Sequence, residues 1–277
     1  MHIRILLNSI ALEPNRWTDG KTPFFRLEEL VEPIARHDFK GIEVWQNHLS
    51  MLEDKEIAEL RERAGDLGLD FPVVGFYPEL HLVGSDGEVA LAESLGLMDK
   101  AAALGANTVK MFVGSKASKE LTDLEEAATF ASLETLIDAA EDRDLLLTGE
   151  THAGTLFDSV GACRRALHQI DSDELEICFQ PFDPANTESA IADYTELAES
   201  VIHVHLQGRI GNEMSLLEDA DLDYERFLEA LEINGFAGYL SIEFAKDCVV
   251  DRPEDLDVER VLSNAASDRE FVRRVLE

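Results

Sequence analysis

The sequence predicts an α/β protein built as a single (β/α)8 barrel over residues 1–277. Eight short apolar runs rich in β-branched residues each precede a longer amphipathic segment, an alternation typical of parallel strands with crossover helices. The length fits one such barrel, and no low-complexity linker or change in composition divides the chain. The alternative, a nucleotide-binding open sheet, is disfavoured because no GxGxxG or GxxxxGK[ST] sequence follows any apolar run.

The first four predicted units occupy the N-terminal half of the chain. Each strand is a short apolar run, and each helix repeats apolar residues at intervals of three and four. Strands are expected at 3–9, 41–45, 70–78 and 108–113, and helices at 27–37, 53–67, 88–104 and 121–141. Gly68 and Gly105 follow two of these helices directly, where a left-handed residue commonly ends a helix.

The last four predicted units follow the same pattern. Strands are expected at 145–152, 175–180, 201–206 and 239–244, and helices up to about 170, at 188–199, at 224–234 and after 255. Gly235 again follows a helix. Side chains alternate faces along a strand, so Thr148, Glu150 and His152 are expected on one face of the fifth strand. A buried Glu150 needs a compensating metal, substrate or partner charge, and a satisfied core ion pair is the structural alternative.

The charge balance is strongly acidic. Asp and Glu number 57 against 24 Lys and Arg, for a formal charge of −33. The acids are spread over the predicted helices, as on the surfaces of halophilic proteins, whose charges high salt screens; an ordinary acidic protein is the alternative. Either interpretation disfavours binding to the phosphates of nucleic acids.

Three widely spaced cysteines without a CxxC pair indicate reduced thiols and not a disulfide framework. The N-terminal residues enter a predicted strand without a signal-peptide core, and no apolar stretch has the length of a membrane span. We therefore expect a cytoplasmic protein with no membrane partner.

Polar residues recur where the predicted strands end. In a (β/α)8 barrel these C-terminal strand ends surround the active site. The candidates there are Glu43, Lys110, Glu150, His152, Gln180, His205 and Glu243. Two carboxylates, one imidazole and an amide oxygen suit a divalent cation such as Mn, Mg, Co or Zn. Such an ion polarises carbonyl groups and lowers the pKa of nearby hydroxyls.

Over essentially its whole length the chain resembles the xylose-isomerase-like TIM-barrel superfamily, which contains sugar phosphate isomerases and epimerases. The resemblance is carried by Gly-Glu-Thr-His at 149–152, Ile-His-Val-His-Leu-Gln at 202–207 and Gly-Tyr-Leu-Ser-Ile-Glu at 238–243. It implies Glu150, Gln180, His205 and Glu243 as metal ligands, because the family takes its ligands from strands five to eight. It also implies Glu150 and Glu243 as the catalytic acid/base pair.

The sixth strand departs from the family's pattern, which often reads Asp-x-x-His. Here the residues are Gln180-Pro181-Phe182-Asp183. Gln180 is favoured at the ligand position because it ends the apolar run directly, and Asp183 is the alternative. An amide oxygen can bind a hard cation but carries no charge, so the metal affinity is expected to fall unless Asp183 compensates nearby.

Further residues are expected to bind substrate or to support the ligands: Glu43, His81, Lys110, His152, Asp183 and Arg209. Glu43 could contact a hydroxyl or pair with a loop arginine. Lys110 could bind substrate or form an internal ion pair. His203 is expected to give buried support, and Arg209 could hold an anionic group through its planar fork.

The expected function is a divalent-metal-dependent isomerase or epimerase of a small sugar or a related polyol or keto acid, with proton transfer through an enediolate-like intermediate. A dehydratase of the same fold and a non-catalytic metabolite-binding barrel are the alternatives. An endonuclease would need more His and Asp ligands than these strand ends supply. The expected partners are a sugar-like small molecule and further copies of the chain in a homo-oligomer.

Overall fold

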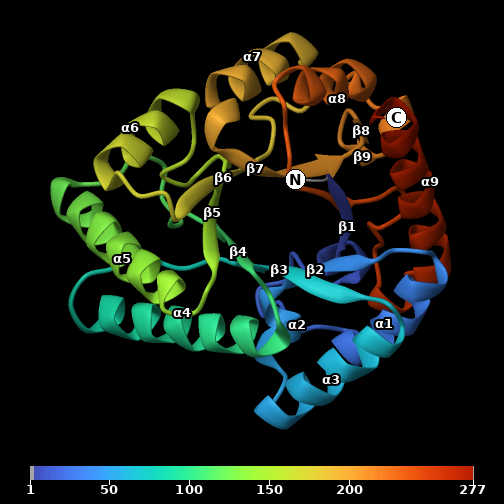
Figure 1. Cartoon of the computed structure of the whole chain (residues 1–277), viewed down its shortest axis with the longest axis horizontal. Coiled ribbons are helices and arrows are strands. Elements are labelled where there is room, and N and C mark those ends of the chain that lie inside the picture. The colour runs from blue at the N-terminus through green and yellow to red at the C-terminus, as the bar shows by residue number, and fades with distance from the viewer. Residues whose placement is uncertain (1–2, 277) are drawn as a thin grey trace.

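The structure, a computed structural model, describes residues 3–276 and contains a closed barrel of eight parallel strands. Around the barrel the strands follow the order β1-β10-β7-β6-β5-β4-β3-β2 (Figure 1). Their bounds are Arg4–Asn8 (β1), Gly41–Trp45 (β2), Asp70–Phe76 (β3), Thr108–Phe112 (β4), Leu146–Glu150 (β5), Leu175–Phe179 (β6), Val201–Gln207 (β7) and Tyr239–Phe244 (β10). The predicted single (β/α)8 barrel is confirmed, and the open sheet is excluded.

Helices surround the barrel on the outside (Figure 1). Their bounds are Leu27–Arg36 (α1), Gln46–Ser50 (α2), Asp54–Asp66 (α3), Gly84–Leu104 (α4), Asp123–Glu141 (α5), Val160–Ile170 (α6), Thr187–Leu197 (α7), Tyr224–Ile233 (α8) and Val258–Leu276 (α9). One helix and two strands were not predicted: α2, and the antiparallel pair Arg209–Ile210 (β8) and Glu213–Met214 (β9). All three are too short to show a hydrophobic period.

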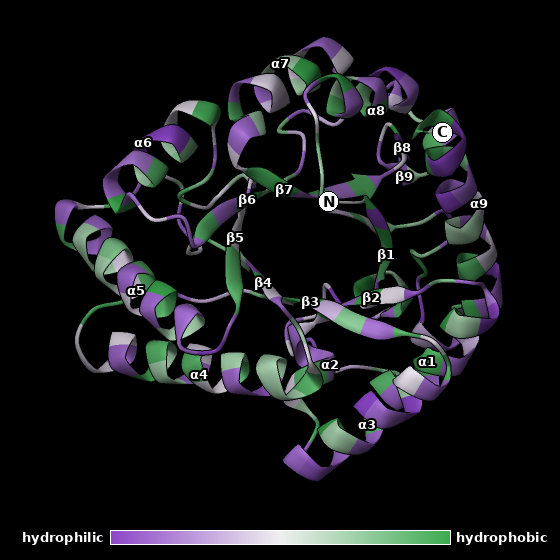
Figure 2. Ribbon diagram, in the orientation of Figure 1, coloured by the Kyte–Doolittle hydropathy of each residue, from purple (hydrophilic) through white to green (hydrophobic). Residues whose placement is uncertain are grey.

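The outer helices carry hydrophobic and hydrophilic residues in alternation along their length (Figure 2). In α1 the buried residues are Leu27, Leu30, Val31 and Ile34, whose spacing of three and four gives one apolar face. Burying each such side chain stabilises the fold by about 1.5–3 kcal/mol. These side chains belong to the hydrophobic core that also contains buried hydrophobic residues of the strands.

Several ionisable side chains point into the barrel. Glu43 on β2, Lys110 on β4, Glu150 on β5 and both His203 and His205 on β7 are at most 1% exposed. The register pairs Lys110 with Thr148 and Glu150 with both Phe112 and Cys178, which brings charges from neighbouring strands together. A buried charge is costly unless it is paired, and clusters of such charges concentrate at functional sites.

No helix within residues 3–276 combines the length and the apolar character needed to cross a membrane. Cys163, Cys178 and Cys248 are all buried and are free thiols. This agrees with the prediction that they form no disulfide framework.

Asp268 on α9 gives a pH-dependent contribution to stability. Its Oδ1 accepts a hydrogen bond from the Leu217 backbone N–H at 2.8 Å, and its Oδ2 has no partner. Burial raises the pKa of Asp268 to about 7 from an ordinary value of 3.8. The folded state therefore keeps a proton that the unfolded chain releases, and the stabilisation, complete below pH 3.8, is lost as the pH rises through about 7.

Between pH 4 and pH 8, we expect the free energy of unfolding of the wild type to fall by about 2–4 kcal/mol relative to that of Asp268→Asn. The asparagine can still accept from the Leu217 N–H but cannot ionise. Urea unfolding at both pH values measures the free energies of both proteins. Groups that titrate in both proteins, such as Glu176, contribute equally and cancel in the difference. Parallel pH profiles for the two proteins would contradict this assignment.

Candidate active site

Three side chains converge at the C-terminal ends of β5, β7 and β10. Ligand atoms of Glu150, His205 and Glu243 all lie within 4.8 Å of one another. His205 Nδ1 is 3.4 Å from Glu150 Oε1 and 3.5 Å from Glu243 Oε2, and this buried nitrogen has no hydrogen-bond partner among the described residues. An unpartnered nitrogen facing two carboxylates is a suitable place for a cation.

Gln180 completes this group from the end of β6. One end of its side-chain amide lies 3.1 Å from both Glu150 Oε1 and Glu243 Oε2. If the amide nitrogen lies at this end, it donates to both carboxylates. If the amide oxygen lies there, it faces two carboxylate oxygens, and a cation is needed between the three. Adjacent ligands of an octahedral ion with bonds of about 2.1 Å are about 3 Å apart. The spacing of the four side chains therefore fits a divalent ion.

Glu43 lies beneath His205 and is fully buried. Both of its carboxylate oxygens are 3.1 Å from His205 Nε2, and Oε2 is also 3.2 Å from His203 Nε2. Burial would raise the pKa of Glu43, but the two imidazoles lower it well below its usual value. The ionised Glu43 accepts the Nε2 proton of His205 and leaves Nδ1 open, the arrangement that orients metal-binding histidines.

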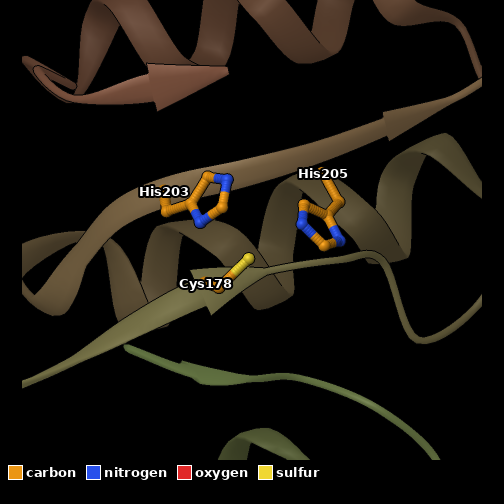
Figure 3. A group of neighbouring side chains, drawn as sticks. All are labelled: Cys178, His203 and His205. Atoms are coloured by element: carbon orange, nitrogen blue, oxygen red, sulfur yellow. The ribbon is translucent and has the colours of Figure 1, made fainter. Parts of the chain in front are cut away.

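Figure 3 shows His203 and His205 on β7 with Cys178 of β6 facing them. His203 Nε2 lies 2.8 Å from Ser241 Oγ, and Nδ1 has no partner among residues 3–276. These three side chains could also hold a metal by their spacing. However, the one open nitrogen of His205 faces the carboxylates. A metal ion beside Cys178 would therefore have two of these three ligands, Cys178 and His203. The geometry favours the group containing Glu150 and Glu243, with His203 as buried support.

Lys110 forms a buried ion pair with Glu150, with 2.5 Å between Nζ and Oε2. Its Nζ also lies 4.7 Å from the centre of the Tyr77 ring and 5.3 Å from that of Phe112. Burial opposes ionisation of Glu150, but Lys110 and His205 lower its pKa to about 2. The structure thus shows the internal ion pair, one of the two roles expected for Lys110. Because Lys110 occupies Oε2, Oε1 of Glu150 is directed to His205 and Gln180.

His205 is flanked by groups that favour its charged form. Burial alone would lower its pKa, but Cys178 and the facing carboxylates raise it well above the ordinary value. Since a metal ion binds the neutral imidazole, ion and proton compete for the open Nδ1.

A cavity of about 510 Å³ opens above these residues. Glu150, Gln180 and Glu243 line it together with aromatic walls and basic side chains from the loops. The volume is that of a small-molecule site. Trp45, Tyr77 and Phe112 form apolar walls that can pack against the carbon face of a sugar.

The remaining predicted residues divide into two sets. His152 and Arg209 line the cavity; the ring of His152 stacks on Phe112 with 4.4 Å between centroids. His81 and Asp183 do not line it: His81 Nδ1 is 3.6 Å from Glu79, and the exposed Asp183 accepts from the Ala185 N–H at 3.1 Å. Thus Gln180, and not Asp183, lies beside the carboxylates.

Sequence reasoning missed several residues of the cavity: Arg16, Trp17, Lys21, Tyr77 and Gln207. Gln207 could have been found, since it continues the alternation of His203 and His205 along the same face of β7. The others lie in loops after β1 and β3, where no period identifies which side chains turn inward.

A model of the family described as xylose isomerase-like TIM barrel matches residues 31–265. The chain belongs to this family. Membership of the xylose isomerase-like family confirms the resemblance inferred from the strand-end motifs, and the match contains all four candidate ligands. Comparison with curated protein sequences gives no significant match.

Solved structures of the xylose isomerase-like barrel superpose over nearly the whole chain. D-psicose 3-epimerase of Clostridium cellulolyticum is 17% identical with a TM-score of 0.78, covering 99% of both chains. A probable 3-DHS dehydratase of Bacillus anthracis is 16% identical with a TM-score of 0.75, covering 98% of both. A magnesium complex from Mycobacterium smegmatis is 16% identical with a TM-score of 0.73, covering 99% of this chain and 96% of the other. The fold is therefore one that sugar epimerases and a dehydratase share.

Proposed function

We propose that the protein is a divalent-metal-dependent isomerase or epimerase of a small sugar or a related polyol or keto acid. The observation that carries the proposal is the open Nδ1 of His205. This nitrogen is buried, has no hydrogen-bond partner among the described residues, faces Glu150 and Glu243, and belongs to a ring that Glu43 holds from the other side. When His205 is neutral, Nδ1 is a buried acceptor without a donor, which is costly, and a bound ion would remove that cost.

Glu150, Gln180, His205 and Glu243 are the side chains that would hold the ion, and their oxygen and nitrogen atoms suit Mn, Mg, Co or Zn. When bound, such an ion polarises a carbonyl and lowers the pKa of a neighbouring hydroxyl. The structures of a magnesium complex and of sugar epimerases with the same fold support this proposal.

Glu150 and Glu243 would exchange a proton with a substrate carbon next to the carbonyl, through an enediolate-like intermediate. The two carboxylates differ in their surroundings. Lys110 holds one oxygen of Glu150, whereas the polar contacts of Glu243 within residues 3–276 are with side-chain amides and the His205 ring: Gln207 Nε2 lies 3.5 Å from its Oε2. Glu150 is therefore the more firmly positioned of the two, and Glu243 is the carboxylate that no Lys or Arg among residues 3–276 pairs with. The aromatic walls would exclude water during this exchange.

Incubation with Mn²⁺ and a panel of ketoses in D₂O tests the function. D-fructose and D-tagatose, which epimerase structures of this fold contain, belong in the panel. An isomerase or epimerase incorporates deuterium at carbon and forms a second sugar, both visible by NMR. A dehydratase would instead form a new carbon–carbon double bond from a hydroxy-carbonyl substrate. Mn²⁺ binding without either reaction would favour a non-catalytic metabolite-binding barrel.

The neutral ligand Gln180 leads to a prediction about metal affinity. Gln180→Asp adds a negative charge between Glu150 and Glu243, and we expect it to tighten Mn²⁺ binding by about 10-fold or more, because ligand charge tunes cation affinity. Titration calorimetry at pH 7.5 measures the change. Gln180→Ala serves as the control and should weaken binding. If neither substitution changed the affinity, Gln180 would not be a ligand.

A further inference from the structure

Three basic side chains that line the cavity have no acidic partner among residues 3–276. Arg16, Lys21 and Arg209 all line the cavity, and none forms an ion pair with a carboxylate of residues 3–276. Most other Lys and Arg side chains do form such pairs. In a chain with 57 acidic residues against 24 basic ones, partners are abundant. Three unpaired cations around one cavity therefore point to a ligand that pairs with them.

Arg16 is the most buried of the three, at 3% exposure. It donates to the backbone carbonyl oxygens of Glu13 and Cys248, the latter at 2.6 Å, while its Nε has no partner among the described residues. The guanidinium carbon lies 4.4 Å from the centre of the Trp17 ring and 5.4 Å from that of Phe244. Neutral carbonyls and ring faces orient the charge but do not neutralise it, and such a charge is costly to bury.

Arg209 is held over the candidate metal ligands by a chain of amides. Its Nε donates to Gln207 Oε1 at 2.9 Å, and Gln207 Nε2 lies 3.5 Å from Glu243. With Nε fixed, the orientation of the guanidinium plane is set. No hydrogen bond from its two terminal nitrogens to any described residue is present, so both remain available for a bidentate contact.

Lys21 approaches the cavity from the loop between β1 and α1. Its φ of 43° is left-handed, a conformation uncommon for a residue other than glycine. Asn47 Nδ2 donates to the Lys21 carbonyl oxygen at 2.7 Å and so stabilises this backbone, and Lys21 Nζ lies 5.7 Å from the centre of the Tyr77 ring. Strained residues persist where their surroundings fix them, and they concentrate at binding sites.

We propose that Arg16, Lys21 and Arg209 form a subsite for the carboxylate or phosphate group of an anionic sugar derivative. The arginine forks match the paired oxygens of either group. The substrate of the proposed isomerase or epimerase would then be a sugar acid or a sugar phosphate and not a neutral sugar; this inference rests on the proposed function only in assigning the ligand as substrate. Glu79, the acid that lines the cavity besides Glu150 and Glu243, is itself engaged by Ser115.

Binding of three unreactive five-carbon probes tests the subsite: D-arabinitol, D-arabinonate and D-arabinitol 5-phosphate. Calorimetry is done with EDTA present, so that a probe carboxylate cannot bind a metal ion. We expect at least one anion to bind about 10- to 100-fold more tightly than the neutral polyol, as charge-assisted hydrogen bonds require. The tighter anion identifies which group the subsite accepts.

Variants locate the effect. Arg209→Gln and Lys21→Gln should each reduce the preference for the anion by about 10-fold. Neither side chain is fully buried, so both variants are expected to fold even if Arg16→Gln does not. Arg165→Gln on α6 is the matched control, because Arg165 is exposed, has no ion pair within residues 3–276 and does not line the cavity. This variant should prefer the anion over the polyol as strongly as the wild type does.

Equal affinity for the polyol and both anions, or no measurable binding of either anion, overturns the proposal. An anion preference that survives in Arg209→Gln and Lys21→Gln also overturns it. The D₂O exchange experiment, repeated with a ketose phosphate or a keto sugar acid, reports on the proposed function separately: a carbonyl-containing anion that binds at the subsite but shows no exchange leaves the subsite intact and removes the isomerase assignment.

Discussion

Replacing Glu243 with Gln is expected to lower kcat for deuterium exchange into the substrate by about 10³-fold. General acid/base groups contribute about 10²- to 10⁴-fold, and the amide cannot accept the proton. Glu243 is the carboxylate that lacks a lysine partner, whereas Glu150 is held by Lys110. The exchange is measured by NMR at saturating Mn²⁺, so that a weaker affinity for the ion does not appear as slower chemistry.

His152→Gln is the control for this prediction. His152 also lines the cavity, but its Nδ1 lies 2.6 Å from the Ala153 carbonyl oxygen and its ring stacks on Phe112. Its replacement should therefore change kcat by less than about 10-fold. If Glu243→Gln exchanged deuterium as fast as the wild type under saturating Mn²⁺, Glu243 could not be the base.

Lys110→Met is expected to reduce the free energy of unfolding by about 3–5 kcal/mol in metal-free protein, because it leaves Glu150 buried with its closest cation removed. Lys110 is fully buried, and its Nζ lies 2.5 Å from Glu150 Oε2. Methionine keeps most of the volume of the side chain, so the loss reports the charge and not a cavity. Urea unfolding with EDTA present measures it.

Two further proteins separate the charge effect from a packing defect. In the double variant Lys110→Met with Glu150→Gln, no charge is left unpaired, and most of the lost stability should return. Lys116→Met, at the part-exposed pair with Glu125, should change stability little because solvent screens that pair. Mn²⁺ should restore part of the stability of Lys110→Met, because the ion also compensates Glu150. Equal losses in the single and double variants would show that Lys110 acts through packing alone.

The barrel and the main ligands could be predicted because their determinants are local. Each strand is an apolar run, and the alternation of side chains along it is enough to place Glu150, His205 and Glu243 toward the inside. The order of parallel strands then brings their ends together without knowledge of any individual contact.

Other features depend on contacts between distant residues and could not be predicted. Glu43 meets a histidine 162 positions later in the chain, so its role as the support of His205 follows only from barrel closure. The sequence left open whether Lys110 contacts substrate or Glu150. The register between β4 and β5 brings Lys110 close enough to Glu150 to form the ion pair. Arg16 and Lys21 belong to a loop, where side-chain direction depends on tertiary packing and not on a repeating pattern.

The lysine inside the barrel would also determine when the proposed cation can be acquired. Many small metalloproteins remain unfolded until an ion assembles their ligands. Here Lys110 and the protons favoured on His203 and His205 supply three positive charges against the carboxylates of Glu43, Glu150 and Glu243 without an ion. The newly made polypeptide could therefore complete its barrel first, and the proposed ion would enter afterwards through the cavity. Which metal it carries would then depend on the ions supplied by the cell after folding, as well as on the ligands.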